Sequence, residues 1–304
     1  MQITKPIIIV GTGRCGSTVF HRTLALHPQL MWLSPLAEVF PRRPALNRWA
    51  VTAMGQPLLR KPFGSRIRAN EQYKFWDTHT RGAFSEPCRD LLRTDVTPLV
   101  KRQVHRALES MLTTQRNRLL LKITGWPRIG YLDELFDQPK FIHIVRDGRA
   151  VASSLLHVGF WRGWYGPQGW RSGLLSPEDE ATWEHYDRSF AALAGIEWRI
   201  QMRAMEAAVR SLDPSRFLEI KYESFCEQPW ETCRRILEFS DLPATAAFEE
   251  SVKAIPIRST SNRWRDDLTS GQQRILDELL RDDLIRYGYH ATPSRERVPE
   301  TVPQ

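Results

Sequence analysis

The chain has 304 residues, of which 41% are hydrophobic and 26% charged, and its formal net charge is +8. This composition is typical of a soluble globular protein of one α/β domain with insertions or about two domains. The charge favours an anionic ligand, but no dense Lys/Arg block indicates nucleic acid. No apolar run has the length of a membrane span or the plan of a signal peptide, and the four cysteines lack metal-ligand spacing. We therefore expect a cytoplasmic protein without a disulfide framework.

The first predicted element is a strand over residues 7–10, where four β-branched residues follow one another without polar alternation. Such a run is typical of a strand buried on both faces of a parallel sheet. Residues 11–18 then read Gly-Thr-Gly-Arg-Cys-Gly-Ser-Thr, and a helix is expected from there to the His27-Pro28 pair. A helix start presents unpaired N–H groups, and glycines let the backbone approach an anion closely. The turn is therefore predicted to bind a phosphate group.

This loop departs from the Walker loop of nucleoside triphosphatases in an informative way. The glycine spacing is the same, but Ser17 stands where the Walker loop has a lysine. The cation is instead Arg14, inside the loop, and no acidic strand end is evident that would hold a magnesium ion. We therefore expect a ligand with less charge than a triphosphate, bound without a metal ion. A tight turn that binds no ligand is the alternative.

The rest of the chain alternates between short apolar runs and helical periodicity. The expected strands span residues 30–33, 119–122, 141–145 and 216–222. The expected helices span residues 98–116, 129–136, from about 150, 183–212 as one helix or a broken pair, 229–239 and 269–287. This order predicts a doubly wound parallel sheet with right-handed crossovers, in which ligands bind at the carboxyl ends of the strands. The glycine-rich loop, Glu38, Lys122 and Arg146 all lie at such ends.

Two regions do not follow this alternation. Residues 41–75 are rich in arginine and are expected to be irregular or to form short helices. Residues 159–176 place aromatic residues among glycines, which indicates either a lid that binds an acceptor or a loop packed on the core. We expect one P-loop-like domain over residues 1–290, with acceptor-binding insertions at about 41–117 and 158–182. Residues 291–304 are expected to form a frayed tail.

Residues 11–18 and 145–155 together resemble the sulfotransferases that use 3'-phosphoadenosine 5'-phosphosulfate (PAPS). The first motif is similar to their 5'-phosphosulfate loop, and Val-Arg-Asp-Gly-Arg-Ala-Val-Ala-Ser-Ser-Leu is similar to their 3'-phosphate motif. The arginine in the loop, the His-Pro pair and Val-Arg-Asp-Gly-Arg-Ala most resemble tyrosylprotein sulfotransferases and their bacterial relatives. The resemblance covers residues 5–38, 118–157 and, more faintly, 216–265.

The resemblance implies a donor site. Arg14 would hold the 5'-phosphosulfate, where charge develops as the sulfuryl group leaves. Arg146 and Ser154 stand at the positions that bind the 3'-phosphate, and Tyr222 resembles a tyrosine near the adenine. The backbone amides that would assist Arg14 are those of Gly13, Cys15, Gly16, Ser17 and Thr18. The late loop that would close over the 3'-phosphate contains Arg258, Arg263 and Arg265, which sequence alone does not separate.

The resemblance also implies catalytic residues. Lys122 would neutralise the bridging oxygen or the transferring group. Cytosolic members of the family carry a histidine two residues later, but here that place is Thr124. Glu38 is similar in order to the glutamate base of the tyrosylprotein enzymes and is the expected base. The weaker candidates for the base are His27, His21 and His157.

The sequence thus predicts in-line transfer of a sulfuryl group from PAPS to an acceptor hydroxyl, with no metal ion. We expect a small metabolite, glycolipid or carbohydrate as the acceptor; the oligomeric state is left open. A P-loop kinase or nucleotide hydrolase would need a lysine in place of Ser17, and a Cys15 phosphatase would need an arginine in place of His21. A nucleotide-binding regulatory module without activity is a further alternative that only an assay separates.

Overall fold

The computed structural model describes residues 2–55, 67–86 and 88–289. Five strands form one all-parallel sheet in the order β2-β3-β1-β4-β5. The strands are β1 (Ile7–Gly11), β2 (Leu30–Trp32), β3 (Arg118–Thr124), β4 (Lys140–Val145) and β5 (Phe217–Lys221). Every residue of β1 is buried, as its unbroken apolar run predicts. The predicted α/β fold with a parallel, doubly wound sheet is therefore confirmed.

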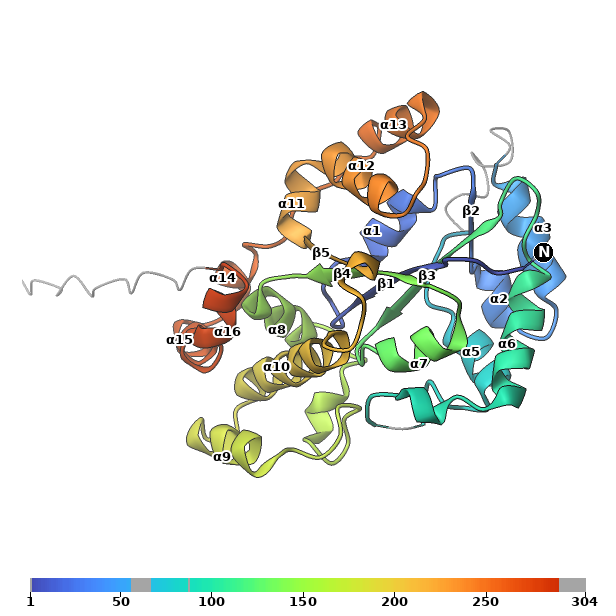
Figure 1. The fold of residues 1–304 in the computed structure, drawn as a ribbon. Coiled ribbons are helices and arrows are strands. Elements are labelled where there is room, and N and C mark those ends of the chain that lie inside the picture. The colour runs from blue at the N-terminus through green and yellow to red at the C-terminus, as the bar shows by residue number, and fades with distance from the viewer. Residues whose placement is uncertain (1, 56–66, 87, 290–304) are drawn as a thin grey trace, which may run out of the picture.

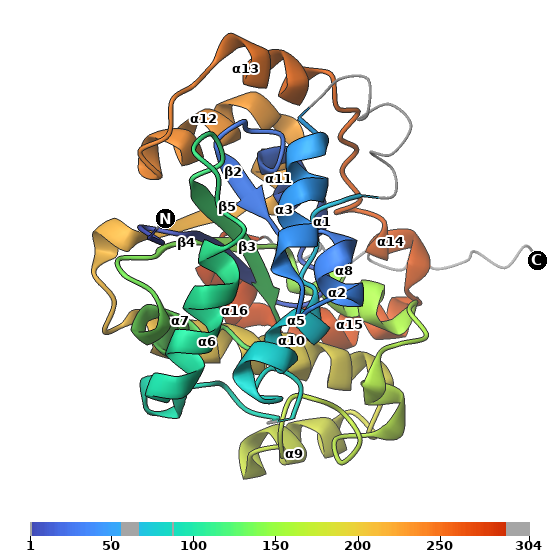
Figure 2. The ribbon, with the colours of Figure 1, turned by 90° about the vertical axis from the view of Figure 1, so that its right-hand side faces the viewer.

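Helices cover both faces of this sheet (Figure 1). In Figure 1, α1, α11 and α12 lie on one side of the sheet, and α7, α8 and α10 lie on the other. Figure 2 shows α2, α3, α5 and α6 gathered at the β2 end. The helices are α1 (Ser17–Leu24), α2 (Pro35–Val39), α3 (Pro44–Ala53), α5 (Tyr73–Thr80), α6 (Pro98–Glu109), α7 (Ile129–Leu135), α8 (Gly148–Leu156), α9 (Pro177–His185), α10 (Phe190–Val209), α11 (Tyr222–Glu227), α12 (Pro229–Phe239), α13 (Ala246–Lys253), α14 (Trp264–Asp267), α15 (Ser270–Leu279) and α16 (Arg281–Arg286).

The long helix expected over residues 183–212 is a broken pair, α9 and α10. Between them, Asp187 and Arg188 adopt left-handed backbone conformations with φ of 51° and 54°. The Ser189 hydroxyl then accepts a hydrogen bond from the Ala192 amide at 3.1 Å and caps α10. A left-handed pair followed by an N-cap ends one helix and starts another, which helical periodicity alone does not show. The final helix is likewise divided, at Leu280.

The strand register brings the predicted functional segments to one edge of the sheet. Gly11 pairs with Thr124 on one side and with Ile144 on the other, so β3, β1 and β4 end at the same level. The glycine-rich loop follows β1, Arg146 follows β4, and Tyr222 follows β5. Ligands of open parallel sheets bind at this edge, next to the strand where the chain reverses its direction of winding.

Within the described residues, no helix is both long enough and apolar enough to cross a membrane. The predicted frayed tail, residues 291–304, lies outside the described residues, as do residues 56–66 of the arginine-rich insertion. The described part of that insertion contains α3 and the start of α5, and its last residues before α5 return to the carboxyl edge of the sheet.

Candidate active site

The loop between β1 and α1 has the conformation of an anion-binding turn. Gly16 caps α1 with a left-handed φ of 88°, and Arg14 is also left-handed with a φ of 66°. A Cβ atom at Gly16 would lie 2.2 Å from the Tyr222 ring, so no other residue fits without moving that ring. The first N–H groups of α1 have no partner within the helix and carry its positive dipole end. The loop therefore presents backbone donors beside a cationic side chain.

Four residues predicted to bind the donor form a chain of contacts. The Arg14 Nε donates to the Ser154 hydroxyl at 2.9 Å, which links the loop to α8. The Arg146 guanidinium donates to the Arg14 carbonyl at 3.0 Å, and its carbon lies 4.7 Å from the centre of the Tyr222 ring. Burial and then the Arg146 charge lower the pKa of Arg14. An anion bound near these two like charges would relieve their mutual repulsion.

The late loop is fastened to this cluster through Thr260. The Arg146 guanidinium donates to both the carbonyl and the hydroxyl oxygen of Thr260, each at 3.0 Å. The three arginines that were not separated by sequence lie elsewhere: Arg258 is exposed, Arg263 pairs with Asp267 at 3.1 Å, and Arg265 stacks on Trp264. Thr260 lines the cavity beside the glycine-rich loop, which is described below. None of these three arginines lines it. No motif in the sequence marks Thr260, which only lies within residues 216–265, the segment that faintly resembles the family.

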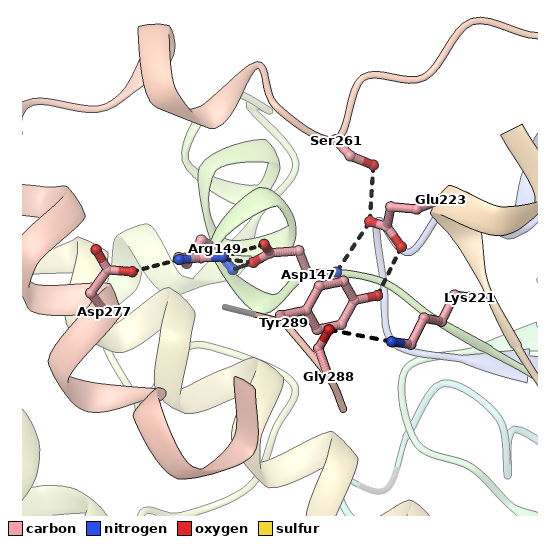
Figure 3. Close-up of polar contacts among 8 residues, drawn as sticks. All are labelled: Asp147, Arg149, Lys221, Glu223, Ser261, Asp277, Gly288 and Tyr289. Carbon is pink, nitrogen blue, oxygen red and sulfur yellow. Dashed lines mark hydrogen bonds and ion pairs between the residues drawn. The ribbon is translucent and has the colours of Figure 1, made fainter. Parts of the chain in front are cut away.

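A half-buried carboxylate, Glu223, holds the late loop in place (Figure 3). It accepts hydrogen bonds from the Ser261 hydroxyl at 2.9 Å, the Tyr289 hydroxyl at 2.8 Å and the Asp147 amide at 3.5 Å. These donors come from the late loop, the segment after α16 and the start of α8. Asp147 in turn binds Arg149, which also reaches Asp277 at 2.6 Å. The network ties the loop that contacts Arg146 to two other parts of the chain.

A cavity of about 1030 Å³ opens beside the loop, and we call it the donor cavity. The predicted donor-binding residues in its wall are Gly13, Arg14, Gly16, Ser17, Thr18, Arg146 and Tyr222. Cys15 and Ser154 are not in this wall; Cys15 is buried behind the loop and Ser154 contacts Arg14. Burial raises the pKa of the Cys15 thiol, which is therefore a poor nucleophile.

Lys122 lies in the wall of the donor cavity with its ammonium group nearly buried. It donates to the Thr18 hydroxyl at 3.0 Å and to the Asn70 side-chain oxygen at 3.2 Å, and lies 3.8 Å from a Glu71 carboxylate oxygen. Burial lowers the pKa of Lys122, and the Glu71 charge opposes this shift. A cation with so little water around it would be well placed to stabilise negative charge that develops on a bound ligand.

A second cavity of about 490 Å³ adjoins the donor cavity, and we call it the acceptor-side cavity. The two cavities share Gly13, Arg14, Glu71, Thr124 and Phe160. Much of the remaining wall is aromatic or cationic: Tyr73, Phe84, Trp126, Arg128, Trp161, Arg162, Trp170 and Arg171. Several of these residues belong to the aromatic loop over residues 159–176.

The aromatic loop is held at both ends by one buried carboxylate, Glu197 on α10. The Trp161 indole donates to Glu197 at 2.6 Å, and the Ser172 hydroxyl donates to it at 3.0 Å. Burial raises the pKa of Glu197, and these two hydrogen bonds oppose the shift. One turn later on α10, the Gln201 side-chain oxygen accepts a hydrogen bond from the Gly13 amide at 3.3 Å. The buried Trp161 and Trp170 anchor the loop on the core, as one alternative from the sequence predicts, and they also line this cavity. Acceptor binding by the loop stays a prediction.

The structure places the predicted base, Glu38, away from both cavities. Its carboxylate accepts a hydrogen bond from the Lys74 amide at 3.0 Å, in the first turn of α5, and Glu38 lines neither cavity. The three candidate histidines line neither cavity either. His21 is fully buried, which lowers its pKa to about 3, while His27 contacts the Pro243 carbonyl and His157 the Ser153 carbonyl.

Glu71, which the sequence reasoning missed, is the carboxylate common to both cavities. The Thr124 hydroxyl donates to it, and Lys122 is its ion-pair partner. No motif marks Glu71, since it lies in the arginine-rich insertion just before α5. Glu71 contacts Lys122 and Thr124 of β3 only in the folded chain, so the sequence pattern could not identify it. In the described part of the chain, no group of three or more His, Cys, Asp or Glu residues could hold a metal ion.

This combination of a parallel sheet, a glycine-rich loop without a lysine and paired arginines defines a class of group-transfer enzyme. The model of the sulfotransferase family matches residues 6–246. The chain therefore belongs to the sulfotransferase family, as its sequence motifs predict, and the predicted enzyme class is confirmed.

The chain is also similar to individual sulfotransferases. The omega-hydroxy-beta-dihydromenaquinone-9 sulfotransferase Stf3 of Mycobacterium bovis and Mycobacterium tuberculosis is 24% identical over 336 residues, which cover 98% of this chain and 79% of Stf3. The structure of sulfotransferase STF9 from Mycobacterium avium matches with a TM-score of 0.59 at 19% identity, over 95% of this chain and 78% of STF9. The sulfotransferase domain from the curacin biosynthetic pathway matches with a TM-score of 0.52 at 14% identity, over 96% of this chain and all of that domain. These two structures share the fold.

Proposed function

We propose that this protein transfers a sulfuryl group from PAPS to the hydroxyl group of an acceptor. The observation that carries the donor assignment is the contact of Arg146 with both the Arg14 carbonyl and Thr260, which joins the phosphosulfate loop to the late loop around one guanidinium. A nucleotide with phosphates at both the 5' and the 3' position has two anionic ends for these two sets of donors. Membership of the sulfotransferase family supports the same donor.

In this proposal the donor lies in the donor cavity with its adenine beside Tyr222. Arg14 and the loop amides hold the 5'-phosphosulfate, and Arg146 holds the 3'-phosphate, assisted by Ser154. The acceptor oxygen attacks sulfur in line with the bond to the 5'-phosphate oxygen. Lys122 and Arg14 stabilise the charge that develops on the leaving phosphate and on the sulfuryl oxygens. No step of this proposal calls for a metal ion.

The acceptor is proposed to bind in the acceptor-side cavity, because that cavity meets the donor cavity at the loop and at Glu71. Its aromatic wall fits an apolar or aromatic body, and its arginines fit polar or anionic substituents. The name of the Stf3 relative specifies a menaquinone-type lipid acceptor, which agrees with an apolar body. Among the acceptors expected from sequence, these features favour a lipid-like or aromatic metabolite over a carbohydrate.

Two finer predictions from the sequence belong to this proposal. We treat residues 1–290 as one catalytic unit in which the insertions contribute the acceptor side. The resemblance of the motifs to those of tyrosylprotein sulfotransferases stays a prediction. The proposal for the acceptor rests on the aromatic wall of the acceptor-side cavity and does not use that resemblance.

The donor assignment is tested by calorimetric titration with 3'-phosphoadenosine 5'-phosphate (PAP), beside 5'-AMP and Mg-ATP. We expect PAP to bind without metal and to require its 3'-phosphate. Arg146→Ala should weaken PAP binding by about 10- to 100-fold, since a charged hydrogen bond contributes about 1.5–3 kcal/mol, and should weaken 5'-AMP binding far less. Arg162→Ala is the matched control, because Arg162 lines the acceptor-side cavity alone. A preference for Mg-ATP would favour a kinase, and PAP binding without transfer to any acceptor would favour a regulatory module.

A further inference from the structure

We infer that Glu71 is the base that takes the proton of the acceptor hydroxyl. The inference rests on the proposed sulfuryl transfer and assigns a residue to a step that the proposal leaves open. It follows from where the ionisable groups lie with respect to the two cavities.

The position of Glu71 is the first argument. A base must lie within hydrogen-bond reach of the acceptor oxygen, which itself must lie next to the transferring group. Of the described residues that line both cavities, Glu71 is the one that bears a carboxylate, and no histidine lines either. The other carboxylate of the acceptor-side cavity, Glu197, already accepts hydrogen bonds from Trp161 and Ser172. Glu71 is therefore the proton acceptor best placed where donor and acceptor meet.

The contacts of Glu71 are the second argument. The Thr124 hydroxyl donates to one carboxylate oxygen, and Lys122 lies 3.8 Å from the other. Thr124 pairs with Gly11 in the sheet, so Glu71 is held above the point where the phosphosulfate loop begins. The side chain of Glu71 is 17% exposed, which leaves it accessible from the cavities. A carboxylate fixed by two partners and still open to the cavity is oriented for proton transfer.

The step balances without a further reactant. The acceptor oxygen forms a new bond to sulfur while the bond between sulfur and the 5'-phosphate oxygen breaks. The proton of the acceptor hydroxyl passes to a carboxylate oxygen of Glu71, and the electron pair of the broken bond stays on PAP. Lys122, between Glu71 and Thr18, lies beside both the base and the loop that holds the leaving phosphate.

The test compares two acceptor probes that differ in their need for a base. Alcohols such as 2-naphthylmethanol remain protonated at neutral pH, whereas a large fraction of 4-nitrophenol is already ionised there and needs no base. We expect Glu71→Gln to lower transfer to 2-naphthylmethanol by about 100- to 10,000-fold, the usual contribution of general-base catalysis, and to lower transfer to 4-nitrophenol far less. PAP affinity should be unchanged, which shows that the donor site has folded.

Three variants complete the experiment. Thr124→Val removes one hydrogen bond to Glu71 at constant shape and should lower transfer to 2-naphthylmethanol by up to about tenfold. Glu38→Gln is the competing candidate and should retain transfer to both probes. Glu231→Gln on α12 is the matched surface control, because Glu231 pairs only with its helical neighbour Arg234 among the contacts described.

The outcomes separate this inference from the proposed function. Normal transfer to 2-naphthylmethanol by Glu71→Gln, or equal losses with both probes, would overturn the assignment of the base while PAP binding still supports the donor site. A large loss in Glu38→Gln, selective for 2-naphthylmethanol, would return the role to Glu38. A wild-type protein that does not bind PAP would overturn the proposed function itself.

Discussion

The donor cavity and the acceptor-side cavity share a wall, but they are assembled in different ways. The predicted phosphosulfate-binding part of the donor-cavity wall comes mainly from residues 13–18, which follow β1, and from Arg146, which follows the adjacent strand β4; other segments, such as residues 52–55 and 67–71, complete the cavity. The acceptor-side cavity draws its side chains from at least four segments that are far apart in the chain, including α5, the aromatic loop and α10. A site made from backbone amides is encoded locally, whereas a site made from apolar side chains depends on how the insertions fold.

This contrast predicts that the donor cavity is sensitive to changes of backbone geometry. Gly16→Ala should have the largest effect, because an L-residue is strained at φ 88° and its Cβ would lie 2.2 Å from the Tyr222 ring. We expect the free energy of unfolding to fall by about 2–4 kcal/mol and PAP affinity to be lost together with the position of Tyr222. Urea unfolding and calorimetry measure the two effects.

Gly271→Ala is the control for this change, since a Cβ at Gly271 would meet only the Thr269 hydroxyl oxygen at 3.9 Å. It should leave PAP binding unchanged. A Gly16→Ala protein that binds PAP normally would show that the loop does not need its left-handed glycine, and would weaken the assignment of the anion site.

The late loop is the part of the donor site that depends on tertiary contacts, and Glu223 tests this dependence. Glu223→Gln replaces one acceptor oxygen by a donor, where the Ser261 and Tyr289 hydroxyl groups and the Asp147 amide all donate. We expect PAP affinity to fall by about tenfold, as for the loss of one hydrogen bond to a charged group. Tyr289→Phe removes a single donor and should have a smaller effect. An unchanged PAP affinity in Glu223→Gln would show that the late loop does not need this network.

We expect the smallest effect on donor binding from Asp90, which lines neither cavity but contacts Arg128 in the wall of the acceptor-side cavity. Its carboxylate accepts hydrogen bonds from the Arg128 and Leu91 amides, and burial raises the pKa of Asp90 to about 6. The folded state therefore binds the proton more tightly than the unfolded state, so the stability from this group is present below about pH 4 and is lost as the pH rises to about 6.

Asp90→Asn keeps an acceptor oxygen without the charge. The variant should be more stable than the wild type at pH 7.5 by at most about 3 kcal/mol, and this gain should shrink towards pH 4. PAP affinity should not change. Urea unfolding at several pH values measures the difference, and a gain that does not vary with pH would contradict the ionisation argument.

Where local signals were strong, the sequence predicted the structure. The helix from Pro229 to Phe239 has the expected ends, because a proline at its first position starts it and its apolar face is periodic. The break between α9 and α10 was left open, because two left-handed residues decide it. The choice of Glu38 as the base rests on its order in the chain; in the structure its carboxylate accepts a hydrogen bond from the Lys74 amide and lines neither cavity.

By itself, the sequence determined the parallel sheet, the glycine-rich turn after β1 and the placement of Arg146 directly after β4, whereas β3 continues past Lys122 to Thr124. Those features depend on neighbours in the chain: a buried β-branched strand, a glycine turn and a helix start. Only the tertiary structure decided which carboxylate lies between the two cavities and which loop residue contacts Arg146. Glu71 reaches Lys122 because the insertion returns to the end of β3, and Thr260 reaches Arg146 because Glu223 fastens the late loop. Contacts between residues about 50 to more than 100 positions apart depend on packing, which local periodicity does not encode.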